Sequence, residues 1–352
     1  MSKFVSESYE LRLTNLSRNK KKLNLNTRSF IFNSFALILF AALLIYINLF
    51  FGSINISFSD LKEGIASDIF YNIRVPKTIT AILAGGSLAI SGLLMQTLFR
   101  NPLAGPYVLG VSSGAGLFVA IAMILFGGVT NYFVGKTLIS ISAITGSLLI
   151  MALVLFISKR SRSNTTVLLV GIMLSQVLGA FQGLIEYMSN PAALKSFVVW
   201  GMGSVSNTSN KDIFILLPVC LLFCLMTLFL SKPLNAILLN ETYAQNLGIN
   251  VNRLRMTIIL VTAILTGLIT AFCGPIAFVG LSVPIACRLL FKTSHQLHQI
   301  TYCFFVGAIT LLLCDSICQL LSNSYALPIN TITTLIGSPV VIYLIFKSKT
   351  IS

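Results

Sequence analysis

Side chains that could support chemistry are few in this sequence, and none of them forms a recognisable catalytic pattern. Two of the nine acidic residues, Glu186 and Asp315, fall inside long apolar runs, and they form no paired-carboxylate site. The two histidines, His295 and His298, give a metal centre few ligands. No phosphate-binding G-x-x-x-x-G-K-[ST] loop, G-x-S-x-G elbow or H-E-x-x-H motif occurs. We therefore expect no catalytic residue, no metal site and no cofactor.

Arg74 and Lys77 are a closely spaced basic pair that could bind an acidic partner. They precede a long apolar run, where a basic side chain can also lie along lipid and keep its charge at the membrane surface. Charge complementarity would instead give the pair a docking role. The residues alone leave both interpretations open.

The polar stretch between the sixth and seventh apolar runs predicts a short helix that lies off the membrane. Asn240 is a good N-cap, Glu241 places a negative charge in the first turn, and Gly248 can end the helix. Ala244 and Leu247 would share a face. Such a helix suits a groove on a soluble motor protein, and a structured loop is the alternative.

Glycine and proline interrupt the apolar pattern at two further places. Arg100, Asn101 and Pro102 open a tight turn between two apolar runs. The segment 274–284 contains two glycines and two prolines, which break regular helix and serve either packing or a hinge.

The elements that position these residues are membrane helices. Of the 352 residues, 56% are hydrophobic and 9% are charged, and the mean hydropathy is +0.91. An average soluble domain carries about 25% charged residues, so lipid is the solvent that suits this surface. Residues 1–28 form a basic N-terminal segment, and residues 29–348 form one membrane domain. The first apolar run is longer than the core of a signal peptide, and we expect it to stay as a span.

Runs of about 20 apolar residues predict an all-α polytopic membrane protein of about ten spans. The eighth is short and contains Pro284, so it could be tilted or broken. The expected spans are 29–51, 78–98, 107–127, 137–158, 165–188, 213–230, 256–272, 276–290, 300–321 and 331–346.

The basic residues give these spans an orientation. With both termini in the cytoplasm, most of the 24 basic residues lie inside, as the positive-inside rule requires. The net charge of +15 is spread over short connections and forms no continuous basic face, so we expect no nucleic-acid partner. The chain is expected in the cytoplasmic membrane. The basic residues that fall outside are Lys62, Arg74, Lys77, Lys136, Lys195 and Lys211.

Taken together, these segments closely resemble the FecCD-type permeases, which are the membrane subunits of ABC importers for iron–siderophore complexes, haem and cobalamin. The resemblance runs from about Ser57 to the C-terminus. The matching motifs are R-x-P-[RK] at Arg74–Lys77, S-G-x-x-M-Q at Ser91–Gln96, R-N-P-L-A at Arg100–Ala104, L-G-V-S-S-G-A at Leu109–Ala115, E-x-x-A-x-x-L-G at Glu241–Gly248, G-P-I-x-F-V-G-L at Gly274–Leu281, Asp315, and L-P-I…I-G-S-P at Leu327–Pro339. The motif positions with an expected structural role are Gln96, Arg100, Asn101, Pro102, Gly114, Gly274, Pro275, Gly280, Pro284, Arg288, Asp315, Pro328, Gly337 and Pro339.

The resemblance implies a type II ABC importer permease that pairs with a second copy or a close relative. Two cytoplasmic ATPases would dock beneath it, and an extracytoplasmic binding protein would deliver the ligand. The segment 236–248 would be the coupling helix that seats in the ATPase. Arg74 and Lys77 match external basic residues that pair with glutamates of the binding protein. The pathway would follow the subunit interface, with the fifth and tenth spans as candidates.

The sequence departs from the family pattern at four positions. Ile285 replaces a usual histidine, and Gln319 replaces a common external arginine. Asn330 and Asn240 each stand where glycine is usual. These changes put one docking charge in doubt, and they leave the predicted topology unchanged.

An ion-gradient-driven secondary transporter is the alternative function. Such carriers usually keep several ionisable groups buried at mid-membrane, and Glu186 and Asp315 are thin support for one. We expect a transport subunit without ATPase activity of its own. The family's commonest cargo is a siderophore complex, but the sequence leaves the choice between siderophore, haem and cobalamin open, as it does the choice between homodimer and heterodimer.

Overall fold

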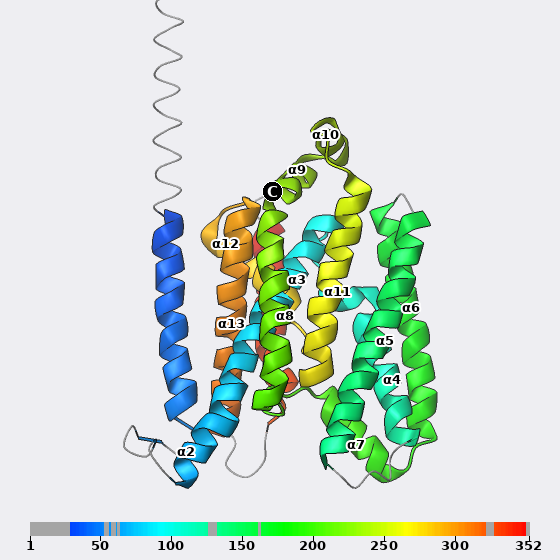
Figure 1. Ribbon diagram of the computed structural model, residues 1–352. Helices are drawn as coiled ribbons and strands as arrows, with labels where there is room; N and C mark the ends of the chain where they lie inside the picture. The colour runs from blue at the N-terminus through cyan, green and yellow to red at the C-terminus, as the bar shows by residue number, and fades with distance from the viewer. Residues whose placement is uncertain are drawn as a thin grey trace, which may run out of the picture.

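The computed structural model describes residues 29–52, 56–57, 61, 64–125, 132–160, 163–321 and 327–349. The predicted basic segment 1–28 and Lys62 lie outside these ranges. All the regular secondary structure in the described ranges is helical, which confirms the all-α prediction (Figure 1).

The first helix covers Ser29–Phe50. A continuous helical run follows, made of α2 (Ile65–Ile69), a wider turn (Phe70–Arg74) and α3 (Val75–Phe99). The remaining elements are a short 3-10 turn (Pro106–Leu109), α4 (Val111–Leu125), α5 (Tyr132–Arg160), α6 (Asn164–Tyr187), α7 (Pro191–Gly201), α8 (Asn210–Phe229), α9 (Ser231–Leu239), α10 (Glu241–Asn246), α11 (Val251–Cys273), α12 (Val279–Phe291), α13 (Gln296–Leu321) and α14 (Ile329–Lys349).

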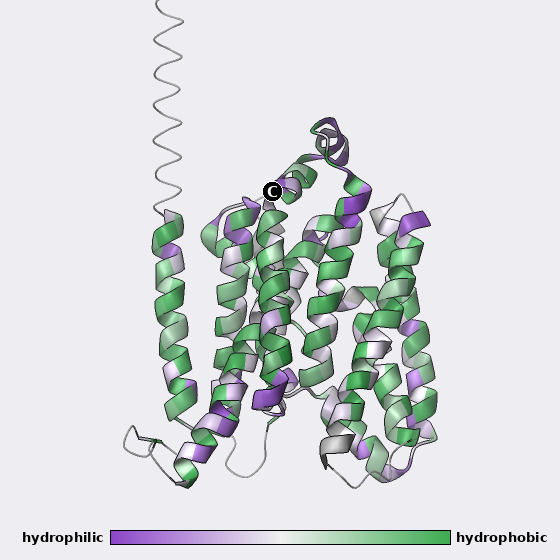
Figure 2. Cartoon of the chain, viewed as in Figure 1, coloured by the Kyte–Doolittle hydropathy of each residue, from purple (hydrophilic) through white to green (hydrophobic). Residues whose placement is uncertain are grey.

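Seven described helices are long and apolar enough to cross a membrane, and three shorter apolar helices accompany them. Apolar residues cover most of the helix surfaces, and polar residues gather toward the two ends of the bundle (Figure 2). Phe214 and Phe229 of α8 are each more than four-fifths exposed. Large apolar side chains presented in this way are stable against lipid.

Helix α3 forms the centre of the bundle. Almost all of its residues from Thr78 to Leu98 are buried, and α11, α12 and α13 pack directly on it (Figure 1). Its small residues permit close approach, since a Cβ atom on Gly85 would collide with the backbone of Gly307 in α13. A Cβ atom on Gly92 would likewise collide with Gly280 of α12.

The second span and helix α7 both differ from the sequence prediction. The second span, expected at 78–98, continues upstream to Ile65 as a run of 35 residues. Pro76 removes a backbone donor, and the wider turn just before it lets the helix continue. Helix α7 was not predicted, although Asn190 caps it by accepting a hydrogen bond of 2.8 Å from the Ala193 amide and Pro191 takes its first position.

The single short helix expected at 236–248 is two helices. Asn240 separates α9 from α10 with extended backbone angles (φ −168°, ψ 150°). A residue that caps a helix must leave the helical conformation, and Asn240 therefore ends α9 as it begins α10. Together α9 and α10 project beyond one end of the bundle, which we call the α10 end (Figure 1). Helices α2 and α7 lie at the opposite end, which we call the α2 end.

Candidate functional site

The α10 end carries the short helix that the sequence predicted. The side-chain oxygen of Asn240 accepts a hydrogen bond of 3.4 Å from the Thr242 amide. Gly248, with φ 79°, closes the helix, and the Ile249 amide donates to the Ala244 carbonyl at 3.0 Å. Ala244 is fully buried, whereas Leu247 is 58% exposed, so these two residues do not share a face as expected. The exposed apolar surface of the segment is formed by Leu238, Leu239, Tyr243 and Leu247.

Three side-chain contacts attach this segment to the bundle. Arg100, at the end of α3, donates from Nη2 to the carbonyl of Ile237 in α9 at 2.7 Å. Asn235 of α9 accepts a hydrogen bond of 2.9 Å from the Gln296 amide at the start of α13. Glu241 of α10 lies 4.0 Å from the guanidinium of Arg255 in α11, which is buried. The segment is thereby linked to three different helices.

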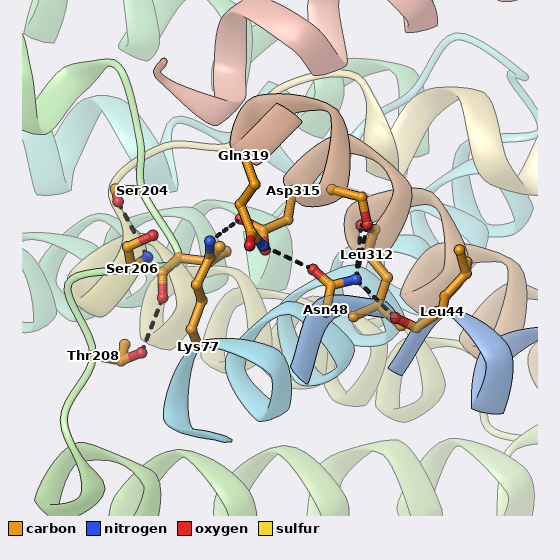
Figure 3. A network of polar contacts seen from close by, with 11 residues as sticks. Leu44, Asn48, Lys77, Ser204, Ser206, Thr208, Leu312, Asp315 and Gln319 are labelled. Carbon is orange, nitrogen blue, oxygen red and sulfur yellow. Dashed lines mark hydrogen bonds and ion pairs between the residues drawn. The ribbon is translucent and has the colours of Figure 1, made fainter. Parts of the chain in front are cut away.

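The predicted docking pair lies at the α2 end, and both cations have partners within this chain. Arg74 is 6% exposed and donates from Nη1 to the Leu49 carbonyl at 2.8 Å. Lys77 of α3 forms an ion pair of 2.9 Å with Asp315 of α13 (Figure 3). Sequence reasoning treated Asp315 as a motif position and as an acidic residue inside an apolar run, and the structure brings it to Lys77.

Gln319 and Asn48 extend this ion pair into a polar network across three helices (Figure 3). Gln319 donates to Asp315 at 2.8 Å and to the side-chain oxygen of Asn48 at 3.1 Å. Asn48, in the first helix, donates to the hydroxyl of Ser316 at 2.9 Å and to the carbonyl of Leu312 at 3.3 Å. Gln319, where the family pattern has an arginine, thus hydrogen bonds the carboxylate that neutralises Lys77. Sequence reasoning missed Asn48, although an asparagine inside an apolar run is itself a signal.

An open cavity of about 380 Å³ lies beside the ion pair at the α2 end. Its polar walls include Lys77, Asp315, Gln319, Ser204 and Ser206. The ion pair is therefore nearly enclosed by protein but still borders a polar space.

A second cavity, of about 490 Å³, lies between α12, α13 and α14. Its walls are mostly apolar, with hydroxyl groups from Ser282, Thr310 and Thr333. Gly337 lines it and packs against the side chain of Phe278. This cavity borders α14, the helix that corresponds to the predicted tenth span.

The other motif positions hold helices and turns in place. Gln96 of α3 donates to the Leu281 carbonyl at 3.1 Å and accepts a hydrogen bond from Arg288 of α12. The side-chain oxygen of Asn101 accepts a 2.9 Å hydrogen bond from the Leu103 amide, which fixes the turn around Pro102. These contacts are structural, and they place no reactive group at a common site.

Glycine and proline positions of the motifs serve close packing and irregular backbone. Gly114 packs against Gly146, and Gly274 has φ 71° beside the Trp200 carbonyl, just before Pro275. Pro284 and Pro339 lie inside α12 and α14, and Pro328 directly precedes α14. Asn330, which departs from the family pattern, accepts a hydrogen bond of 3.0 Å from the Ala277 amide. Ile285, the other departure in this region, is buried.

No group of three or more histidine, cysteine, aspartate or glutamate side chains that could hold a metal ion occurs among the residues that the structure describes. The candidate functional features are a projecting segment at one end of a helical bundle and a charged network at the other.

Comparisons with known proteins agree with this arrangement. The FecCD transport family model matches residues 38–347. The vitamin B12 import system permease protein BtuC of Pectobacterium atrosepticum is 37% identical over 282 residues, covering 79% of this chain and 82% of the relative. The hemin transport system permease protein HmuU of Yersinia pestis is 31% identical over 309 residues, covering 85% and 90%. A solved metal-chelate type ABC transporter in an inward-facing conformation superposes with a TM-score of 0.81 at 30% identity, covering 89% of this chain and 98% of that one.

Proposed function

Because the chain belongs to the FecCD transport family, we propose that it carries a metal chelate, namely an iron–siderophore complex, haem or cobalamin, through the cytoplasmic membrane. It is the permease subunit of an ABC importer, and ATP hydrolysis takes place on a separate subunit. The cargo follows from its relatives, which import vitamin B12 and hemin. Siderophore complexes are included because the family pattern also covers them.

The projecting α9–α10 segment is the observation that carries the proposed mechanism. In our proposal α10 is the coupling helix that seats in a groove of the ATPase. Leu239, Tyr243 and Leu247 offer exposed apolar area for that contact, and Asn240 and Gly248 fix the two ends of the helix. One such helix on each of two permease subunits would engage two ATPases. Closure of the ATPases on ATP would then move both helices.

Our proposal places the α10 end in the cytoplasm, with both termini on that side. The basic residues support this orientation, since Arg100 contacts α9 and the first turns of α11, which follows α10, contain Arg253 and Arg255. The α2 end then faces outward and receives the binding protein.

Arg74 and Lys77 lie at this outward end and are the proposed docking residues for glutamates of the binding protein. Each already has a partner within the chain, so docking would offer Arg74 a carboxylate in place of the Leu49 carbonyl and would compete with Asp315 for Lys77. Charge attraction between the partners would also speed their encounter.

Two permease subunits are proposed to enclose the pathway along their interface. Helices α6 and α14, which correspond to the predicted fifth and tenth spans, are the candidates for its walls. The apolar cavity beside α14 shows that this helix is not tightly packed against α12 and α13 along its full length.

Co-purification tests the proposal. A tagged chain should capture an ATPase from membranes of its own cell, and the pair in proteoliposomes with a binding protein should take up cobalamin, haem or a ferric siderophore only when ATP is supplied inside. Glu241→Arg should abolish capture, because it places a cation beside the buried Arg255 and displaces α10. Uptake driven by an ion gradient without ATPase would instead identify a secondary transporter.

A further inference from the structure

Arg100 ends α3 in a backbone conformation that costs energy for an arginine. Its φ of 48° and ψ of 37° lie in the left-handed region, which glycine and asparagine adopt most readily. A side chain kept in strained backbone points to a use for that side chain. The contacts of the guanidinium show what the use is.

The guanidinium of Arg100 binds the open end of α9. Its Nη2 donates to the carbonyl of Ile237 at 2.7 Å. Ile237 lies in the last turn of α9, where carbonyl groups lack partners within the helix and the helix dipole is negative. Arg100 therefore satisfies an acceptor and places a positive charge where the dipole favours one.

This contact joins α9 to the end of α3, and a movement of α10 would have to pass between these two helices. Asn240 alone separates α9 from α10, so α10 cannot shift far without moving α9. Arg100 directly follows the last residue of α3 and caps it, and α3 is the most enclosed of the described membrane helices. At its other end α3 carries Lys77, which is paired with Asp315.

We propose that Arg100 is a positioning residue for transport, which locks α9 to the end of α3 so that a displacement of α10 reaches the centre of the bundle. The inference rests on the proposed role of α10 as the coupling helix. Asn235, which caps α13, and Arg255, which faces Glu241, hold the same segment from two further sides. Arg100 differs from them because it joins the segment directly to the central helix.

Arg100→Asn separates this role from a merely structural one. Asparagine accepts the left-handed conformation but is too short to reach Ile237, so the variant keeps the turn and loses the link. Arg100→Lys keeps a positive charge and a donor. Lys232→Asn, at an exposed lysine of α9, is the matched control for the loss of one cytoplasmic charge. The complex of this chain with its captured ATPase and binding protein is assayed in proteoliposomes, with cobalamin, haem and a ferric siderophore as cargo probes.

The measured quantity is cargo taken up per ATP hydrolysed. Arg100→Asn should lower this ratio by about ten-fold, the size of effect expected when a hydrogen bond from a charged donor is lost. Capture of the ATPase and the thermal unfolding temperature should match those of Lys232→Asn, and Arg100→Lys should restore part of the ratio.

An unchanged ratio in Arg100→Asn would overturn the inference. A parallel fall in ATPase capture, unfolding temperature, the rate of uptake and the rate of ATP hydrolysis would also overturn it, because that pattern indicates an assembly defect. Failure of the proposed function is distinguishable, since it would be seen in the unsubstituted chain as a lack of ATPase capture or of ATP-dependent uptake.

Discussion

Lys77 of α3 and Asp315 of α13 form an ion pair at 2.9 Å whose side chains are 13% and 4% exposed. The pair fastens together two helices that also meet through the close contact of Gly85 with Gly307. A basic residue that sequence reasoning placed on an outer surface is thus also part of the internal structure of the bundle.

Breaking the ion pair should destabilise the protein mainly because it leaves a buried charge without its partner, and less because the attraction between the two charges is lost. Lys77→Met should lower the free energy of unfolding by about 3 kcal/mol, because it leaves Asp315 as an unpaired buried charge. The double variant Lys77→Met/Asp315→Leu should recover most of that loss. Thermal or denaturant unfolding in detergent measures both. If the loss of unfolding free energy in the double variant equals the sum of the losses in Lys77→Met and Asp315→Leu, the two residues are not energetically coupled.

Close packing at the centre of the bundle predicts that substitution of glycine by alanine affects stability very differently at two positions. Gly92→Ala should destabilise the protein by about 1–3 kcal/mol, since the added methyl group meets the backbone of Gly280 and forces α3 from α12. Gly179→Ala in α6 has open space around the new Cβ atom and should be neutral, or stabilising by up to about 1 kcal/mol. The unfolding temperatures of the two purified variants test this difference in stability. Equal temperatures would contradict the α3–α12 contact.

The cap of α10 should be needed for the ATPase contact. Asn240→Ala removes the side chain that accepts from Thr242 and should destabilise this short helix by about 1 kcal/mol. We expect weaker ATPase capture with an unchanged unfolding temperature for the whole chain, because α10 lies outside the bundle. Asn252→Ala, at an exposed asparagine of α11, serves as the control. Full capture by Asn240→Ala would argue that the cap is dispensable.

The proposed docking at the α2 end is tested with a substitution that disturbs the internal contacts as little as possible. Arg74→Gln removes the charge and keeps a donor for the Leu49 carbonyl. Affinity for the binding protein should fall several-fold at low salt, and the difference from the unsubstituted chain should shrink as salt rises. Lys195→Gln, at an exposed lysine of α7, should change the affinity less. Binding is measured at two ionic strengths. If Arg74→Gln changed neither the affinity nor its salt dependence, Arg74 would not belong to the docking surface.

Features set by neighbouring residues were the ones that the sequence could predict. The cap at Asn240, the end at Gly248 and the turn at Arg100–Pro102 depend on a few adjacent side chains, and each was identified. Apolar runs likewise predicted the membrane helices, because lipid imposes a minimum length on each.

Features set by distant residues were missed. Lys77 and Asp315 lie on helices far apart in the chain, and nothing in the local pattern of either indicates the other. Gln319 was noted only as a lost arginine, and its hydrogen bonds to Asp315 and Asn48 appear only once three helices are assembled. Helix α7 was missed although its Asn-Pro start was readable, because its 11 residues are too few to form a membrane span.

The hydrogen bonds of Asn48 also constrain the order in which the helices assemble. Its amide sits in the helix Ser29–Phe50, while its partner Leu312 comes 264 residues later. At about 5–20 residues per second, the ribosome needs roughly 15–50 s to produce that partner. Before α13 is made, the amide can bind the Leu44 carbonyl of its own helix, whereas its contacts with Leu312 and Ser316 cannot form. The polar network at the α2 end can therefore be completed only after α13 has been synthesised.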